Sequence, residues 1–171
     1  MRVLFCGINP SLYSGWAGHH YARPGNRFWP ALHQSGFTPR RLRPDEDATL
    51  VDCGLGCTNL VARATARADE LDAAEFRAGG ERLRALVEEW TPRAVAVVGI
   101  GAARIAFDIP VLEPGRQPQG LGAAQLWVLP STSGLNAHHQ LPELVELFTR
   151  LRLATSRGHP PADGRLYTKA P

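Results

Sequence analysis

The sequence predicts an α/β domain in which a mostly parallel sheet of about four strands lies between two layers of helices, a three-layer α/β/α sandwich. Short apolar runs such as 2–6, in which only Arg2 is polar, and 94–98 are typical of parallel strands buried on both faces. The segments between these runs carry apolar residues at helical spacing. The chain has 171 residues, enough for one such domain, and its 44% hydrophobic and 20% charged residues argue against a disordered chain and a membrane protein.

Strand and helix patterns alternate along the chain. The capping pattern Asp72-Ala-Ala-Glu75 opens the longest predicted helix, and Pro92 stops it. Residues 9–25 carry glycines, prolines, histidines and aromatic residues without periodicity, which predicts a long functional loop. The predicted strands cover 2–6, 57–61, 94–98 and 125–129. The predicted helices cover 27–35, 44–52, the segment from Asp72 to Pro92, 101–107 and 140–153.

We expect one domain over residues 1–157 and a loose tail over 158–171. No apolar run approaches the roughly 18–20 residues of a membrane-spanning helix, and residues 2–6 are too short for the core of an export signal. The three cysteines form no C-x-x-C pair, which argues against a disulfide framework and a metal site and predicts a reducing, cytoplasmic location. We expect a monomer.

The charge is mildly basic, with a net value of +3 and an isoelectric point near 9.1. Lys169 is the only lysine among the 19 basic side chains, so nearly all are arginine. Arginine suits bidentate contacts to phosphate and guanine, although genome composition explains the same bias.

Ligands of parallel α/β sheets bind beyond the carboxyl ends of the strands. In this chain the segments there are 7–25, 61–71, 99–103 and 130–136. In the first of them, Pro10 restricts Asn9 toward extended geometry, so its amide points in a set direction. An amide is a poor general base but can orient a water molecule. The same residues also suit a plain turn at a strand end. Tyr13, Trp16 and Tyr21 offer flat surfaces to a planar ligand.

Several segments together resemble the mismatch-specific uracil-DNA glycosylase and thymine-DNA glycosylase family of the uracil-DNA glycosylase superfamily. The resemblance covers about residues 2–153 with the motifs in family order, and this co-linear set is far more specific than any one piece. The matching segments are Gly7-Ile8-Asn9-Pro10, Pro24-Gly-Asn26-Arg27-Phe28-Trp29, Gln34-Ser-Gly36-Phe37-Thr38, Thr58-Asn-Leu60, Arg63-Ala-Thr65, Glu75-Phe76-Arg77-Ala-Gly79-Gly80 and Leu129-Pro130-Ser131-Thr132-Ser133-Gly134-Leu135.

The resemblance implies a monofunctional DNA N-glycosylase of base excision repair that needs no metal or organic cofactor. Such an enzyme flips uracil, or variably thymine or etheno-cytosine, out of a mispair with guanine in double-stranded DNA and hydrolyses the base–sugar bond, leaving an abasic site. Asn9 would position the hydrolytic water, and Tyr21 would stack on the flipped base. The base pocket would be formed by Gly7, Ile8, Pro10, Ser11 and Tyr21.

The loop after the last predicted strand is similar to the family's second motif. Leu135 would wedge into the hole left by the flipped nucleotide, and Gly134 would allow close backbone approach. Ser131, Ser133 and Asn136 would bond phosphate or the orphan base. In isolation, the same residues suit a Ser/Gly-rich turn between a strand and a helix.

The sequence departs from the family pattern in two places. Ser11 stands where a glycine is common, and Ser131-Thr132 stands where Asn-Pro is common, which affects substrate preference more than reaction type.

Other charged residues are candidates for supporting roles. A carboxylate near the motifs would strengthen water activation, and Asp69 is the candidate; a solvated helix entry is its plain alternative. Candidate phosphate contacts are Arg23, Arg27, Arg63 and Arg67.

Two other functions fit parts of the sequence. Gly99-Ile-Gly101 after a strand is a weak fingerprint of a nucleotide- or phosphate-binding enzyme, because a third glycine and a ribose-binding acid are missing. A non-catalytic DNA-binding module that kept the fold is the other alternative, against which Asn9 argues.

Overall fold

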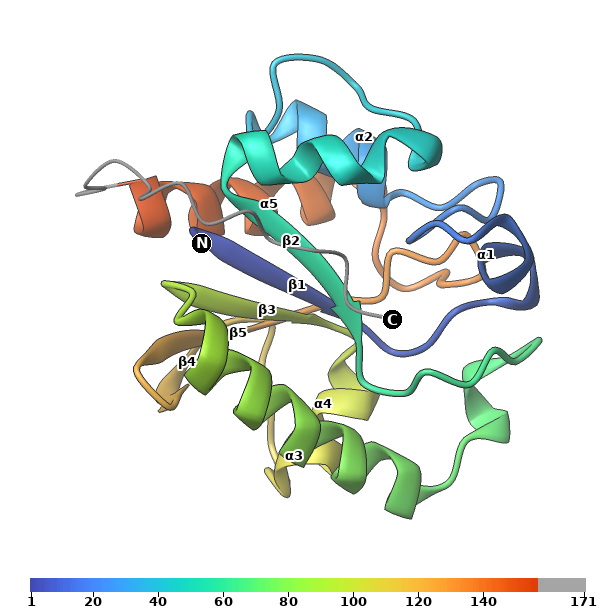
Figure 1. The fold of residues 1–171 in the computed structure, drawn as a ribbon, viewed down its shortest axis with the longest axis vertical. Helices are drawn as coiled ribbons and strands as arrows, with labels where there is room; N and C mark the ends of the chain where they lie inside the picture. The colour runs from blue at the N-terminus through green and yellow to red at the C-terminus, as the bar shows by residue number, and fades with distance from the viewer. Residues whose placement is uncertain (157–171) are drawn as a thin grey trace.

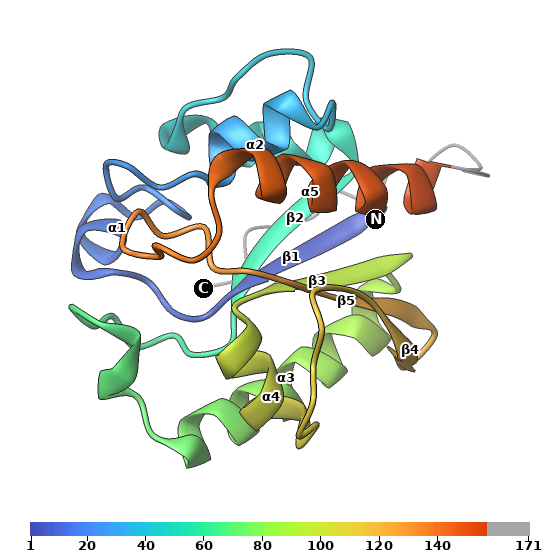
Figure 2. The same ribbon diagram turned by 180° about the vertical axis from the view of Figure 1, so that it is seen from behind.

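A central sheet of five strands in the order β2-β1-β3-β5-β4 runs through the middle of the protein, with helices on both faces (Figures 1 and 2). The computed structural model describes residues 1–156, so the predicted tail over 158–171 lies outside the described residues. The strands are β1 (Val3–Gly7), β2 (Leu55–Asn59), β3 (Ala94–Val98), β4 (Gly115–Leu121) and β5 (Ala124–Leu129). All neighbouring strands pair in parallel except β4 and β5. The predicted three-layer, mostly parallel architecture is therefore confirmed.

Helices α2 and α5 cover one face of the sheet, and α3 and α4 cover the other (Figure 1). The α-helices are α1 (Leu12–Ala17), α2 (Phe28–Gln34), α3 (Ala73–Trp90), α4 (Ile100–Phe107) and α5 (Leu141–Ser156). Two 3-10 helices, η1 (Pro44–Cys53) and η2 (Ala68–Glu70), lie in the connections. None of the helices within residues 1–156 is long and apolar enough to cross a membrane.

Strand β1 shows why the apolar runs become the centre of the sheet. Its side chains alternate between the two faces, so that Val3 and Phe5 enter one core and Leu4 and Cys6 enter the other. All four are fully buried. Phe5 packs edge-on against Phe28, with ring centroids 5.3 Å apart. A strand buried on both faces must be apolar throughout, as this sequence is.

Three elements differ from the sequence expectation. Strand β4 was not expected, because Gly115–Leu121 contains glycines, a proline and polar residues rather than an apolar run. It pairs antiparallel at the sheet edge, where such residues are tolerated. Strand β2 lies at Leu55–Asn59 rather than 57–61, and the long loop contains the short helix α1.

The strand register brings the candidate motifs together. Gly7 at the end of β1 pairs with Asn59 at the end of β2, and β3 and β5 run in the same direction. Their carboxyl ends therefore meet at one edge, where the loops 8–27, 60–72 and 130–140 converge (Figure 2).

Candidate functional site

A groove of about 890 Å³ opens at the carboxyl ends of β1 and β2 and continues along the edge strand β2 toward Trp90 of α3. Polar and small residues from both sequence motifs line its mouth. The lining residues that were predicted for the site are Gly7, Ile8, Asn9, Pro10, Ser11, Tyr21, Arg23, Arg67, Ser131, Ser133 and Leu135. The fold thus brings the first loop and the loop after β5 to one cavity.

The Asn9 side chain is held in one orientation. Its Nδ2 donates hydrogen bonds to the Arg63 carbonyl at 2.9 Å and to Thr65 Oγ1 at 2.7 Å. Thr65 Oγ1 in turn donates to the Arg67 carbonyl at 2.7 Å, so it must accept from Asn9. Both amide hydrogens are therefore used, and Oδ1 is left as an acceptor. Asn9 is half-buried and lines the cavity, so this oxygen is available to a water molecule.

Gly7 makes room for the polar groups beside it. A Cβ at this position would lie 2.5 Å from Asn59 Oδ1 and 3.2 Å from the Tyr21 hydroxyl oxygen. The Tyr21 ring stacks on Phe28, with centroids 3.9 Å apart and planes 14° apart, so one of its faces is already covered. Its buried hydroxyl has no hydrogen-bond partner within residues 1–156. Desolvation, with Cys57 and Cys6 nearby, raises the pKa of Tyr21 well above its ordinary value, so the phenol stays neutral.

The tip of the first loop is tied to η1. Asp47 Oδ2 accepts a hydrogen bond from the His20 backbone N–H at 3.3 Å and lies 3.3 Å from His19 Nδ1. The Asp47 side chain is only 7% exposed, and all three residues line the cavity. Sequence reasoning did not single out Asp47, because its partners are far away along the chain.

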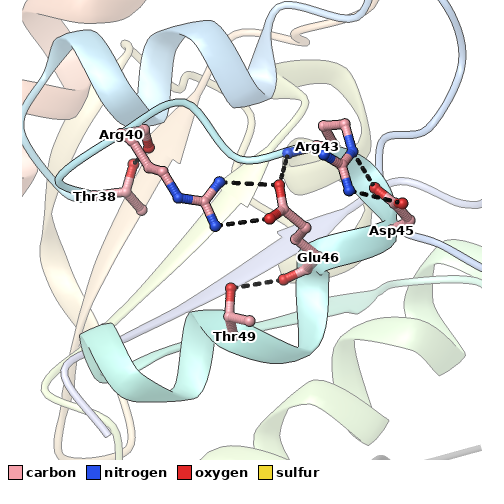
Figure 3. Close-up of polar contacts among 6 residues, drawn as sticks. All are labelled: Thr38, Arg40, Arg43, Asp45, Glu46 and Thr49. Atoms are coloured by element: carbon pink, nitrogen blue, oxygen red, sulfur yellow. Dashed lines mark hydrogen bonds and ion pairs between the residues drawn. The ribbon is translucent and has the colours of Figure 1, made fainter.

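Ion pairs fix the start of η1 and thereby the position of Asp47. Glu46 accepts from both terminal guanidinium nitrogens of Arg40, at 2.7 and 3.1 Å, and from the Arg43 backbone N–H at 2.8 Å (Figure 3). The Arg40 guanidinium and the Arg43 N–H lower the pKa of Glu46 to about 2. Thr49 closes the same turn by donating to the Glu46 carbonyl.

Arg27 braces the loop after β5 rather than facing solvent. Its guanidinium donates to the carbonyls of Ser133, Asn136 and His139 at 2.6, 2.8 and 2.6 Å. Its backbone N–H donates to the Thr132 carbonyl at 2.9 Å. This geometry leaves little capacity for the phosphate contact expected of Arg27. The sequence motif therefore pointed to Arg27, but in the structure its guanidinium binds backbone carbonyls of the loop instead of facing a phosphate.

The candidate wedge stands out from this braced loop. The Leu135 side chain is 67% exposed, whereas Asn136 Nδ2 turns inward to the Ser131 carbonyl at 2.9 Å. A Cβ at Gly134 would lie 2.9 Å from the Gly25 carbonyl oxygen, so glycine permits the close contact between the two loops. In this structure the Asn136 side chain therefore bonds to its own loop, not toward solvent where phosphate or the orphan base would lie.

The other predicted charges fall into two groups. Arg63 pairs with Glu75 at 2.9 Å, and Arg67 pairs with Asp69 at 2.7 Å. Asp69 is 64% exposed in η2 and is not among the residues that line the groove. Arg23 is exposed at the rim of the groove, and its guanidinium makes no hydrogen bond or ion pair within residues 1–156. Of the four candidate arginines, Arg23 has its charge most available to an anion.

Of the two glycines after β3, Gly99 has a packing role. Gly99 has a φ of +149°, and a Cβ there would lie 2.7 Å from Ile8 Cγ1. Gly101 meets nothing within 4 Å. Close packing against Ile8 therefore explains Gly99 without a bound phosphate.

Besides Asp47, Asn59 and Thr65 of the cavity were missed as site residues, although both lie in segments that carried the family resemblance. Asn59 ends β2 beside Gly7, and Thr65 holds the Asn9 amide. The signal available in the sequence was a polar residue at the end of a strand, Asn59, and another in a loop, Thr65. Only the fold shows that Asn59 lies beside Gly7 and that Thr65 bonds to Asn9. Within the part of the chain that the structure describes, no three His, Cys, Asp or Glu side chains gather as a metal site requires.

Comparison with protein families gives one finding. The family model of the Uracil DNA glycosylase superfamily matches residues 1–152, which includes every strand, the groove and both loops at its mouth.

Proposed function

Because this chain belongs to the uracil DNA glycosylase superfamily, whose members are DNA-acting hydrolases of base excision repair, we propose that it excises uracil from mispairs with guanine. Thymine and etheno-cytosine are further candidate substrates. The observation that carries this proposal is the Asn9 amide, whose two hydrogens are bonded to Arg63 and Thr65 while Oδ1 borders the groove. The motifs quoted above favour the mismatch-specific and thymine-DNA branch of the superfamily.

The target base must leave the helix before its glycosidic bond is accessible. Extruding a nucleotide costs a few kcal/mol, and a mispaired base costs least, which favours mispairs as substrates. The groove mouth offers the extruded pyrimidine the Tyr21 ring and the backbone of residues 7–11, with Asn59 beside them. Leu135, exposed at the same mouth, would fill the vacated position in the duplex.

The chemical step is hydrolysis at the sugar carbon. A water molecule that donates to Asn9 Oδ1 presents its lone pair to the C1′ atom. The C1′–N bond breaks, its electron pair leaves with the base, and the water oxygen bonds to C1′ and loses a proton, which the departing base anion takes up directly or through solvent water. Asn9 takes no proton itself, because an amide is not a base near neutral pH. Its contribution is orientation of the water and stabilisation of the cationic sugar by the amide oxygen.

Single-turnover excision tests the role of Asn9. Asn9→Ala should reduce the excision rate on a labelled duplex with one G:U pair by about 100-fold or more, on the scale of removing one positioned catalytic group. The affinity for the duplex should change little. Gln34→Ala, on the exposed end of α2, is the control and should excise at the wild-type rate. Alkali treatment then reveals the abasic site.

The same assay separates the alternatives. A DNA-binding module without activity would shift the duplex and leave no alkali-labile site. A nucleotide-binding enzyme would neither shift the duplex nor create an alkali-labile site. Either outcome would refute the proposed excision.

A catalytic role for Asp69 stays a prediction. The carboxylate pairs with Arg67 and would have to leave it to reach a nucleotide. Asp69→Asn should then slow excision more than binding, and an unchanged single-turnover rate would remove Asp69 from the mechanism. A monofunctional, monomeric enzyme in the cytoplasm likewise remains our expectation.

A further inference from the structure

The polar and apolar faces of helix α1 are exchanged relative to those of an ordinary surface helix. Its small polar side, with Ser14 and Gly15, faces the protein and the groove, whereas Leu12, Tyr13 and Trp16 face solvent. The solvent-facing side chains are 58%, 44% and 82% exposed. Surface helices normally bury their large apolar residues, so the folding of this chain does not account for the exposure of these three side chains.

The exposed face belongs to a helix that hydrogen bonds cap and tie to its neighbours. Ser11 caps α1 by accepting from the Ser14 backbone N–H at 3.1 Å, and Ser14 Oγ accepts from the Ala22 backbone N–H at 3.1 Å. The Leu12 backbone N–H donates to the Thr65 carbonyl at 3.1 Å. The segment that orients Asn9 therefore also anchors α1.

Tyr13 and Trp16 form an open aromatic pair. Their ring centroids lie 5.7 Å apart, and the planes are tilted by 59°. Two other tryptophans, Trp29 and Trp127, are each only 3% exposed. Trp16 thus differs in presenting its indole to solvent.

The position and charge of α1 indicate what this pair contacts. The helix lies beside the loop between β5 and α5 that carries the exposed Leu135 (Figures 1 and 2). Arg23, whose guanidinium makes no hydrogen bond or ion pair within residues 1–156, directly follows Ala22, and the Ala22 backbone N–H donates to Ser14 Oγ of α1. The pair therefore lies near an available positive charge that suits a polyanion, and α1 lines the same groove through Ser14 and Gly15.

We propose that Tyr13 and Trp16 are a stacking platform for unpaired DNA bases that flank the flipped nucleotide. Flat side chains beside basic residues bind single-stranded DNA without regard to sequence, because every base has a π-face. The platform rests on the proposed DNA substrate and extends it: this protein should hold a single-stranded or locally opened segment next to the groove.

Binding of a uracil-free single-stranded oligonucleotide tests the platform independently of excision. Trp16→Ala should weaken this binding about 5- to 150-fold, the range that corresponds to loss of one stacked base. Trp16→Phe should retain most of it. Val111→Ala, at a 75% exposed position before β4, is the matched control and should bind as the wild type does. The wild-type tryptophan fluorescence should be quenched by the oligonucleotide, and Trp16→Phe should lose this response.

Several outcomes would overturn the platform. Wild-type affinity in Trp16→Ala would do so, and so would undiminished quenching in Trp16→Phe. Concentration-dependent dimers abolished by Trp16→Ala with DNA binding intact would also do so, since the face would then join two copies of the chain. If the wild type excises no uracil, the proposed function is refuted. The oligonucleotide measurement then decides by itself whether Tyr13 and Trp16 bind unpaired bases.

Discussion

Replacing Arg27 by lysine should weaken binding of double-stranded DNA and leave its salt dependence unchanged. The guanidinium holds three carbonyls of the loop that carries Leu135. Lysine keeps the positive charge, but its ammonium group cannot reproduce the planar fork that reaches several acceptors at once. The variant therefore separates bracing of the loop from attraction to phosphate.

The magnitude follows from the number of bonds lost. A hydrogen bond from a charged group contributes about 1.5–3 kcal/mol, and lysine can replace one of the three Arg27 bonds to backbone carbonyls. The remaining loss destabilises the ordered loop, although such terms do not add fully. We expect about 10- to 100-fold weaker binding, which corresponds to about 1.4–2.8 kcal/mol.

Binding constants measured across a range of salt concentrations provide the assay. A lost phosphate contact lowers the slope of log K against log salt by about 0.9. Arg23→Ala, which removes the exposed guanidinium at the groove rim, should show this change, whereas Arg27→Lys should not. Arg116→Lys on the exposed edge of β4 is the control. Wild-type affinity in Arg27→Lys, together with a reduced slope in Arg27→Ala, would show that Arg27 contacts phosphate instead.

Two further predictions concern stability. Gly79→Ala should destabilise the fold by about 1–2 kcal/mol in urea unfolding despite the better helix propensity of alanine, because a Cβ there would lie 2.3 Å from the Leu60 carbonyl oxygen. Gly101→Ala, which meets nothing within 4 Å, should be neutral or stabilising; a stabilised Gly79→Ala would contradict this packing. Arg63 and the Asp72 backbone N–H lower the pKa of Glu75 to about 2, so the stabilisation is complete above about pH 4.5 and is lost as pH falls toward 2. Glu75→Gln should therefore lower stability at pH 7 and flatten the acid limb of the stability profile, and a profile identical to the wild type would refute this.

Much of the fold could be predicted from local sequence. The runs at Val3–Gly7 and Ala94–Val98 are apolar because parallel strands are buried on both faces, and the Asp72 capping box opens α3 where the pattern placed it. Strand β4 escaped prediction because an antiparallel edge strand needs no apolar run. Its pairing depends on the neighbouring strand rather than on its own residues.

The sequence by itself determined that Asn9, Tyr21 and Leu135 belong to segments meeting at one edge of a parallel sheet. Only the tertiary structure decided what each polar group does there. Arg23 and Arg27 are the same residue type a few positions apart, yet one charge is open to solvent and the other is occupied by backbone carbonyls more than a hundred residues away. Hydrogen bonds and ion pairs depend on which groups folding brings within reach, and that information lies in distant parts of the chain.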